Sequence, residues 1–168
     1  AAANIRNSKR PAPELDIAVR ISRPYGARVN RHWLKRVLAE TLEVEEVARA
    51  EVSLVIVGDE KIWDLNRRYR NVDAPTDVIA FALAEPAEET FVTPPDDILH
   101  LGEIVISYPT AAAQAHERGH STQQELATLS VHGMLHLLGF DHEKPAEARR
   151  MRLREKKILA RLKGEKLC

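Results

Sequence analysis

Apolar and polar residues alternate along the first part of the chain in a way that predicts four β-strands. Leu15, Ile17, Val19 and Ile21 recur at every second position, which is typical of a strand with one buried face. A β-branched run that ends at Gly58 predicts a second, well-buried strand. The predicted strands cover residues 15–22, 52–57, 76–83 and 101–108, and the acidic, proline-containing stretch 84–100 is predicted to be a loop.

Apolar residues spaced three and four apart predict helices between and after these strands. Asn30 can cap the first helix, and Asp59 can cap the second. Ser121 and Gln124 form a capping-box pattern, and Gly139 can close the helix that they open. The predicted helices begin after Asn30 and after Asp59, and then cover about 109–118, 121–139 and 145–162, the last of them starting with a first-turn proline.

The order of these elements predicts one α+β domain, in which a small sheet of about four strands has helices packed on it. The domain is expected to cover residues 15–168. Residues 1–14 are polar and proline-containing, so they are predicted to form a disordered N-terminal arm.

Composition narrows the class of protein. A chain of 168 residues with 44% hydrophobic and 30% charged residues suits one soluble globular domain. The longest apolar run, Val78 to Ala84, is too short to span a membrane, and the N-terminus has no apolar signal segment. Cys168 is the single cysteine, which excludes an internal disulfide. We therefore expect a cytoplasmic protein with no membrane partner.

The net charge of zero conceals a marked separation of charge. Residues 84–103 carry six acidic side chains and no Lys or Arg, whereas residues 143–168 carry ten basic and four acidic side chains. The basic segment could contact a polyanion. It could equally be the solvated face of a helix, which charge alone favours.

The candidate chemistry is concentrated in residues 132–142, which read H-G-M-L-H-L-L-G-F-D-H. His132 and His136 lie one turn apart on the same face of the predicted helix. Gly139 can adopt the left-handed conformation that ends a helix, so the chain can return and bring His142 toward the other two histidines. Three nitrogen ligands with an open fourth position are typical of a catalytic zinc site, so we predict one Zn²⁺ per chain.

The spacing of the three histidines is that of the long zinc-protease motif, but Gly133 occupies the position of the protease's general-base glutamate. A bound Zn²⁺ lowers the pKa of a coordinated water to about 7, so hydrolysis or Lewis-acid catalysis is predicted. Peptidase activity is disfavoured unless Asp141 or Glu143 substitutes for the missing base. Asp141 could take a catalytic part beside the metal or could be a turn residue, and the sequence favours neither.

Three segments resemble the YbeY family of bacterial rRNA maturation factors, described as metal-dependent endoribonucleases. The histidine segment 132–142 closely resembles the family signature. Residues 65–81, L-N-R-R-Y-R-N-V-D-A-P-T-D-V-I-A-F, and residues 101–107, L-G-E-I-V-I-S, are similar to two further family blocks in the same order. The resemblance runs from about residue 50 to residue 155, and the first 14 residues match nothing.

The resemblance implies a small mixed sheet flanked by helices, with a zincin-like metal helix and the metal in a cleft. It places His132, His136 and His142 at the zinc ligands, and Arg70 at an arginine that the family is thought to need for activity. Ala80 replaces a usual serine and Glu103 a usual aspartate. Neither position belongs to the predicted metal ligands.

The resulting hypothesis is a zinc-dependent endoribonuclease specific for single strands, acting in 16S rRNA 3′-end maturation and ribosome quality control. Its partners would be rRNA and the ribosome or a ribosome-associated protein. Arg70 can bind a phosphate with two hydrogen bonds, and His132 and Asp141 are the other candidate catalytic residues. Either water or the RNA 2′-hydroxyl could attack. Two rivals are a metalloprotease-like hydrolase and a non-catalytic zinc-stabilised RNA-binding module in ribosome assembly.

Overall fold

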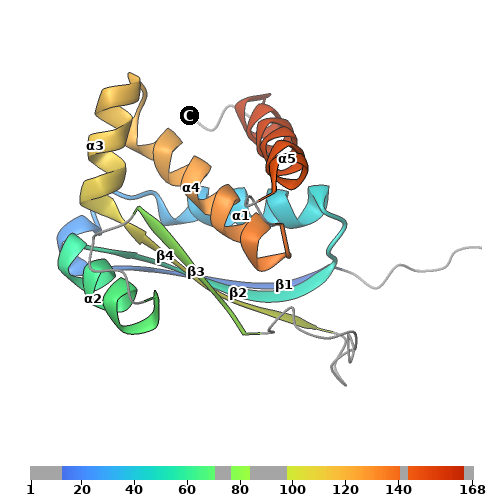
Figure 1. The fold of residues 1–168 in the computed structure, drawn as a ribbon, viewed down its shortest axis with the longest axis horizontal. Coiled ribbons are helices and arrows are strands. Elements are labelled where there is room, and N and C mark those ends of the chain that lie inside the picture. Colours follow the sequence, from blue (N-terminus) through green and yellow to red (C-terminus); the bar gives the residue numbers. More distant parts are fainter. Residues whose placement is uncertain (1–12, 71–76, 84–97, 141–143, 165–168) are drawn as a thin grey trace, which may run out of the picture.

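The structure is a computed structural model that describes residues 13–70, 77–83, 98–140 and 144–164. Within them the chain forms one four-stranded sheet in the order β1-β2-β4-β3 (Figure 1). The first three of these strands are parallel and the edge strand β3 is antiparallel to β4, so the predicted mixed sheet is confirmed. The strands are β1 (Glu14–Ile21), β2 (Arg49–Val57), β3 (Val78–Ala82) and β4 (Leu99–Ser107).

Helices cover both faces of the sheet. Among the described residues the helices are a 3-10 turn (Arg23–Tyr25), α1 (Arg31–Val44), α2 (Asp59–Arg70), α3 (Tyr108–Arg118), α4 (Thr122–Leu137) and α5 (Pro145–Gly164). Figure 1 shows α2 on one side of the sheet and the other four α-helices on the opposite side. The α+β class predicted from the sequence is therefore confirmed.

The two faces have separate cores because side chains alternate along each strand. In β4, Ile104 and Ile106 are fully buried in the core that contains α1 and α4. Between them, Val105 is buried on the other face, where it packs with Ile62 of α2. The alternation thus assigns α2 and α4 to opposite faces of the sheet.

The last helix, α5, forms an outer layer on α1 and α4. Its apolar residues Met151, Ile158 and Leu162 are buried in a cluster with α1 and α4. Arg161 adds an ion pair to Glu40 of α1, with 2.7 Å between Nε and Oε1. The predicted apolar stripe of this helix is therefore what fixes α5 over α4.

Several predicted element boundaries were wrong by one to three residues. The second strand begins at Arg49 and not at Val52. Leu99 and His100 belong to β4 and not to the preceding loop. Tyr108, predicted to end that strand, instead begins α3, because the Ser107 hydroxyl accepts the Thr110 N–H and caps the helix.

The prediction that Asp59 caps α2 is wrong, because Asp59 is the first residue of this helix. The carbonyl of the preceding glycine accepts the Ile62 N–H. The Asp59 carboxylate accepts hydrogen bonds from the hydroxyls of Ser107 and Thr110, the latter at 2.8 Å. It therefore ties the start of α2 to the start of α3.

Three of the helix-end signals predicted from the sequence are confirmed, at the start of α1 and at both ends of α4. Asn30 caps α1 by accepting the Trp33 N–H, and Ser121 and Gln124 form the reciprocal capping box of α4. After α4, Gly139 takes a positive φ of 98°. The Gly139 N–H binds the His136 carbonyl and the Phe140 N–H binds the Leu135 carbonyl, the pattern that reverses a chain after a helix.

Gly102 occupies an irregularity in β4 that no other residue type fits. The pairing of β2 with β4 shifts between Glu51 and Val52, so that Leu101 is an extra residue on the β4 side. Gly102 has φ +133°, and a Cβ added there would lie 2.0 Å from the Phe81 carbonyl oxygen of β3. The glycine therefore permits the bulge and the close approach of the edge strand.

No described helix combines the length and the apolar character needed to cross a bilayer. Residues 1–12 of the predicted N-terminal arm and most of the predicted loop 84–100 lie outside the described residues, so both stay predictions. Glu14, predicted as the last residue of the arm, instead begins β1.

We predict that Gly102→Ala destabilises the protein, because its φ and its contact with Phe81 both oppose a side chain. The backbone strain alone should lower the free energy of unfolding by about 1–3 kcal/mol in denaturant titrations. Gly26→Ala is the control: its φ is −56° and the nearest atom to an added Cβ is 3.6 Å away. A Gly102 variant as stable as this control would contradict the proposed packing.

Candidate metal centre

The two histidines predicted to share one helix face point at each other near the end of α4. The Nε2 atoms of His132 and His136 are 3.2 Å apart. Their rings meet edge to face with centroids 4.7 Å apart and an interplanar angle of 72°. Both side chains are half-buried. The helical spacing predicted from the sequence therefore does bring two imidazole nitrogens to one point.

Glu155 of α5 holds the far side of the first histidine. Its Oε1 lies 2.6 Å from Nδ1 of His132, and its side chain is 18% exposed. Because a carboxylate only accepts, the shared proton resides on Nδ1. Nε2 of His132 is then left with its lone pair directed toward His136, which is the tautomer that a metal ligand requires.

No role was predicted for Glu155 from the sequence, although its position in α5 indicated a carboxylate with a buried partner. Glu155 lies four residues after Met151 and four before Leu159, within the stripe of α5 that packs on the rest of the protein. A carboxylate in an apolar stripe is a candidate for a buried partner. Its partner, 23 residues earlier, could be identified only from the tertiary structure.

The pair of histidines fits a zinc ion. Two nitrogens bound to tetrahedral zinc at about 2.0–2.1 Å are separated by about 3.3 Å, and the observed separation of the Nε2 atoms is 3.2 Å. A carboxylate on the other nitrogen of a ligating histidine is the usual support of such sites. The residues present therefore fit the metal that the motif predicts.

The remaining predicted site residues cannot be placed around this pair. His142, Asp141 and Glu143 lie outside the described residues, and no group of three potential His, Cys, Asp or Glu ligands occurs within the described ones. Arg70 is the last residue of α2, on the face of the sheet opposite α4, and its side chain is also outside the description. The roles of these four residues stay predictions.

Gly133 is a packing residue between α4 and the sheet. It is buried, and a Cβ built on it would lie 2.7 Å from Cγ2 of Ile104 in β4. A contact this short requires α4 or Ile104 to move. In the zinc-protease motif, the position of Gly133 is occupied by the glutamate that acts as the general base. In this fold a side chain at that position would be directed at the sheet.

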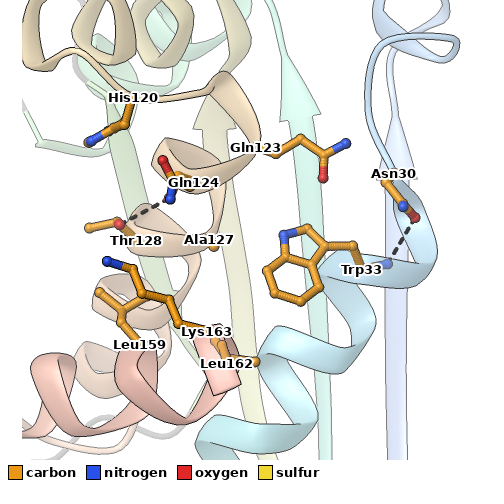
Figure 2. Close-up of a pocket in the computed structure, with 10 residues that line it drawn as sticks. All are labelled: Asn30, Trp33, His120, Gln123, Gln124, Ala127, Thr128, Leu159, Leu162 and Lys163. Carbon is orange, nitrogen blue, oxygen red and sulfur yellow. Dashed lines mark hydrogen bonds between the residues drawn. The ribbon is translucent and has the colours of Figure 1, made fainter. Parts of the chain in front are cut away.

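A cleft of about 600 Å³ lies farther along α4, toward its N-terminus. Figure 2 shows its lining side chains, which come from α1, α4 and α5 and from the turn before α4. Trp33 and Lys163 are among them, and neither His132 nor His136 lines it. The cleft is thus separate from the histidine pair.

Comparison with known proteins assigns the family. Residues 21–163 match the family model described as Endoribonuclease YbeY. The chain belongs to the YbeY family. The match extends the region of resemblance in both directions beyond the motifs that the sequence analysis used.

Individual YbeY relatives agree over most of the chain. A protein of Roseiflexus sp. strain RS-1 named Endoribonuclease YbeY is 46% identical over 151 residues, which cover 89% of this chain and 94% of that one. One of Moorella thermoacetica with the same name is 55% identical over 130 residues, covering 76% and 83%. The solution structure of TM1509 from Thermotoga maritima matches with a TM-score of 0.59 and 27% identity over 89% of this chain and 90% of that one.

Two departures from the usual YbeY motifs have clear positions. Ala80 of β3 pairs with Ile104, the residue beneath Gly133, and is half-buried. Glu103 pairs with Phe81 and, by the alternation along β4, faces the α2 side of the sheet. Neither residue is an immediate neighbour of His132 or His136 in the chain.

We predict that Gly133→Ala lowers the free energy of unfolding by about 1–3 kcal/mol, because the new methyl group meets Cγ2 of Ile104. Ile104→Ala removes that atom, so the double variant should lose less than the two single losses combined. Ile104→Val keeps Cγ2 and should give additive losses. Denaturant titrations of the three single variants and the two double variants measure the coupling between positions 133 and 104. Equal coupling of Gly133→Ala with Ile104→Ala and with Ile104→Val would contradict this packing.

Proposed function

We propose that this protein is a zinc-dependent endoribonuclease that cleaves single-stranded RNA during rRNA maturation. The observation that supports it most is the approach of the two Nε2 atoms to 3.2 Å, with the Glu155 carboxylate on the other nitrogen of His132. This arrangement suits a metal-dependent hydrolase. The family, whose relatives are named endoribonucleases, supports RNA as the substrate.

In this proposal His132, His136 and His142 hold one Zn²⁺. When bound, the metal would polarise a phosphodiester oxygen and make a nucleophile available near neutral pH. Glu155 keeps the proton of His132 on Nδ1 and restricts the rotation of its ring. His132 would then be a metal ligand in the catalytic centre, and Glu155 of α5, 23 residues later in the sequence, would hold its ring in place.

Arg70 would recognise the phosphate. Its guanidinium presents several N–H donors in a fixed fork that matches two phosphate oxygens, so it can neutralise the charge that develops on them. Asp141 would assist as an acceptor for a proton or for a ligand's N–H. Both roles are carried over from the sequence motifs.

RNA is favoured over peptide by the position of Gly133. A peptidase with this ligand spacing needs a glutamate there, and in this fold that position is buried against Ile104. RNA offers an internal alternative, since its 2′-hydroxyl can attack the neighbouring phosphorus without a water molecule. Products ending in a 2′,3′-cyclic phosphate would identify that route.

The biological context proposed is 16S rRNA 3′-end processing and ribosome quality control in the cytoplasm. Exposed basic side chains along α5, such as Arg149, Arg152 and Lys156, would attract the phosphate backbone. Sequence specificity would then come from the ribosome or from a ribosome-bound protein.

We predict that His136→Ala abolishes both zinc binding and RNA cleavage, because it removes one of two nitrogens that face each other. Metal analysis should give almost no zinc per chain, against one in the wild type, and a labelled single-stranded RNA should remain intact. His116→Ala, an exposed histidine of α3, is the matched control and should change neither. Arg70→Ala should lose cleavage and keep its zinc.

These variants also test the rivals. Chelation should abolish cleavage of RNA in the wild-type protein, and casein should remain intact with or without metal. If folded His136→Ala still supports rRNA processing in cells, the protein acts as a binding module and the proposed catalysis is wrong.

We predict that Glu155→Ala weakens zinc binding about 10–100-fold, because Nδ1 of His132 loses its acceptor. Glu155→Gln keeps an acceptor oxygen without the charge and should lie between the wild type and the alanine variant. Glu117→Ala removes an exposed carboxylate of α3 and serves as the control. Competition with a chromogenic chelator measures the affinity, and unchanged affinity in Glu155→Ala would refute this role.

A further inference from the structure

We propose that the cleft between α1, α4 and α5 binds one nucleotide of the RNA strand, next to the phosphodiester that is cleaved. This inference rests on the proposed function, and it names a part of the substrate site that the histidine motif does not include. Its basis is the position of the cleft along two helices and the chemistry of its walls.

The cleft continues the seam between α4 and α5 that begins at the metal centre. His132 of α4 contacts Glu155 of α5, and one turn farther along each helix Thr128 and Leu159 line the cleft. Another turn along, Gln124 and Lys163 line it as well. One helical turn rises about 5.4 Å, which is close to the spacing of successive nucleotides in an extended strand. An RNA strand lying along this seam would therefore reach the cleft within one or two nucleotides of the histidines.

The walls of the cleft suit a nucleobase. Trp33 of α1 is half-buried, and Figure 2 shows its indole ring at the cleft with Gln123 and Gln124 on the neighbouring helix. Leu162 provides an apolar surface below. Aromatic side chains stack on bases of any sequence, and side-chain amides can bind the edges of a base. The low aromatic content of the chain gave no indication of such a platform.

The charge of the cleft suits a phosphate. Lys163 lines it, and no acidic residue is among its lining residues in the described chain. His120 lines it as well, with its ring bound to the carboxylate of Glu125. The nearby carboxylate of Glu125 is fully buried and is bound by Arg118 and His120, so its charge is compensated. A lysine and an aromatic ring on the walls of one cleft are the combination that single-strand nucleic-acid sites use.

The size of the cleft agrees with such a ligand. Its volume of about 600 Å³ lies within the range of about 300–1,000 Å³ that is usual for small-molecule sites. An extended apolar peptide would not need Lys163, so the cationic rim favours a nucleotide over a protein segment.

The chain offers a direct optical probe of this cleft. It has two tryptophans, Trp33 at the cleft and Trp63 on α2, which is 42% exposed and lies on the opposite face of the sheet. In the Trp63→Phe protein, tryptophan fluorescence excited at a wavelength that the three tyrosines do not absorb reports on Trp33 alone. The probe ligand is a 2′-O-methyl oligouridine hexamer, with an abasic hexamer of the same charge for comparison.

We expect the oligouridine hexamer to quench Trp33 fluorescence saturably, and the abasic hexamer to quench it much less, because quenching requires a stacked base. Lys163→Ala should weaken binding at least about threefold and reduce the slope of log affinity against log salt by about 0.7, the value for one phosphate contact on a single strand. Lys157→Ala, an exposed lysine of α5 outside the cleft, should change both quantities much less than Lys163→Ala does.

Binding of the hexamer, seen by fluorescence anisotropy, without quenching of Trp33 would overturn the proposal. Equal effects of Lys163→Ala and Lys157→Ala on the affinity for the hexamer would overturn it too. Lys163 would then attract the strand only through its charge, as any exposed lysine of α5 would, and would not belong to a binding site. If the protein cleaves RNA but shows either result, the cleft assignment alone fails. If the hexamer quenches Trp33 but zinc-loaded protein cleaves no RNA, the proposed catalysis fails and the cleft stands as an RNA-binding site. Quenching by an apolar peptide and not by the hexamer would indicate a protein ligand and would refute the nucleotide.

Discussion

The close approach of α4 to β4 is the constraint on which the rest of the structure depends. Gly133 allows it, because any side chain at that position would meet Ile104. The helix is consequently buried on two sides, with Leu129 and Met134 in the sheet-facing core and Val131 and Leu135 in the cluster with α5. The side that remains carries His132 and His136, so the packing that buries α4 also determines which face presents these two histidines.

The outer helix α5 completes the site from a distance in the sequence. Its apolar stripe and the ion pair from Arg161 to Glu40 fix it against α1 and α4. With the helix fixed, Glu155 reaches His132. The same seam leads to the cleft at Lys163, so α5 contributes an acidic group beside His132 and a basic group to the wall of the cleft. Its charge pattern, which alone suggested a solvated surface, includes one half-buried contact, from Glu155 to His132.

Local signals were the most reliable guide to the fold. Asn30, Ser121 with Gln124, and Gly139 were predicted as helix ends, and each forms the expected hydrogen bonds or conformation. These signals work because a cap binds backbone groups within four residues of itself. Strand boundaries were less accurate, since Leu99 and His100 become strand through pairing with β2, a partner nearly fifty residues away.

The sequence by itself determined the helix that carries the histidines, their common face and the family, because helical periodicity and motif spacing are properties of neighbouring residues. Only the tertiary structure decided that Gly133 is a packing residue, that Glu155 is the partner of His132, and that Trp33 faces a cleft with Lys163. Each of these brings together residues from 23 to 130 positions apart, either in direct contact or around one cleft. Such contacts form only when helices and sheet pack, and no local pattern encodes which side chains then meet.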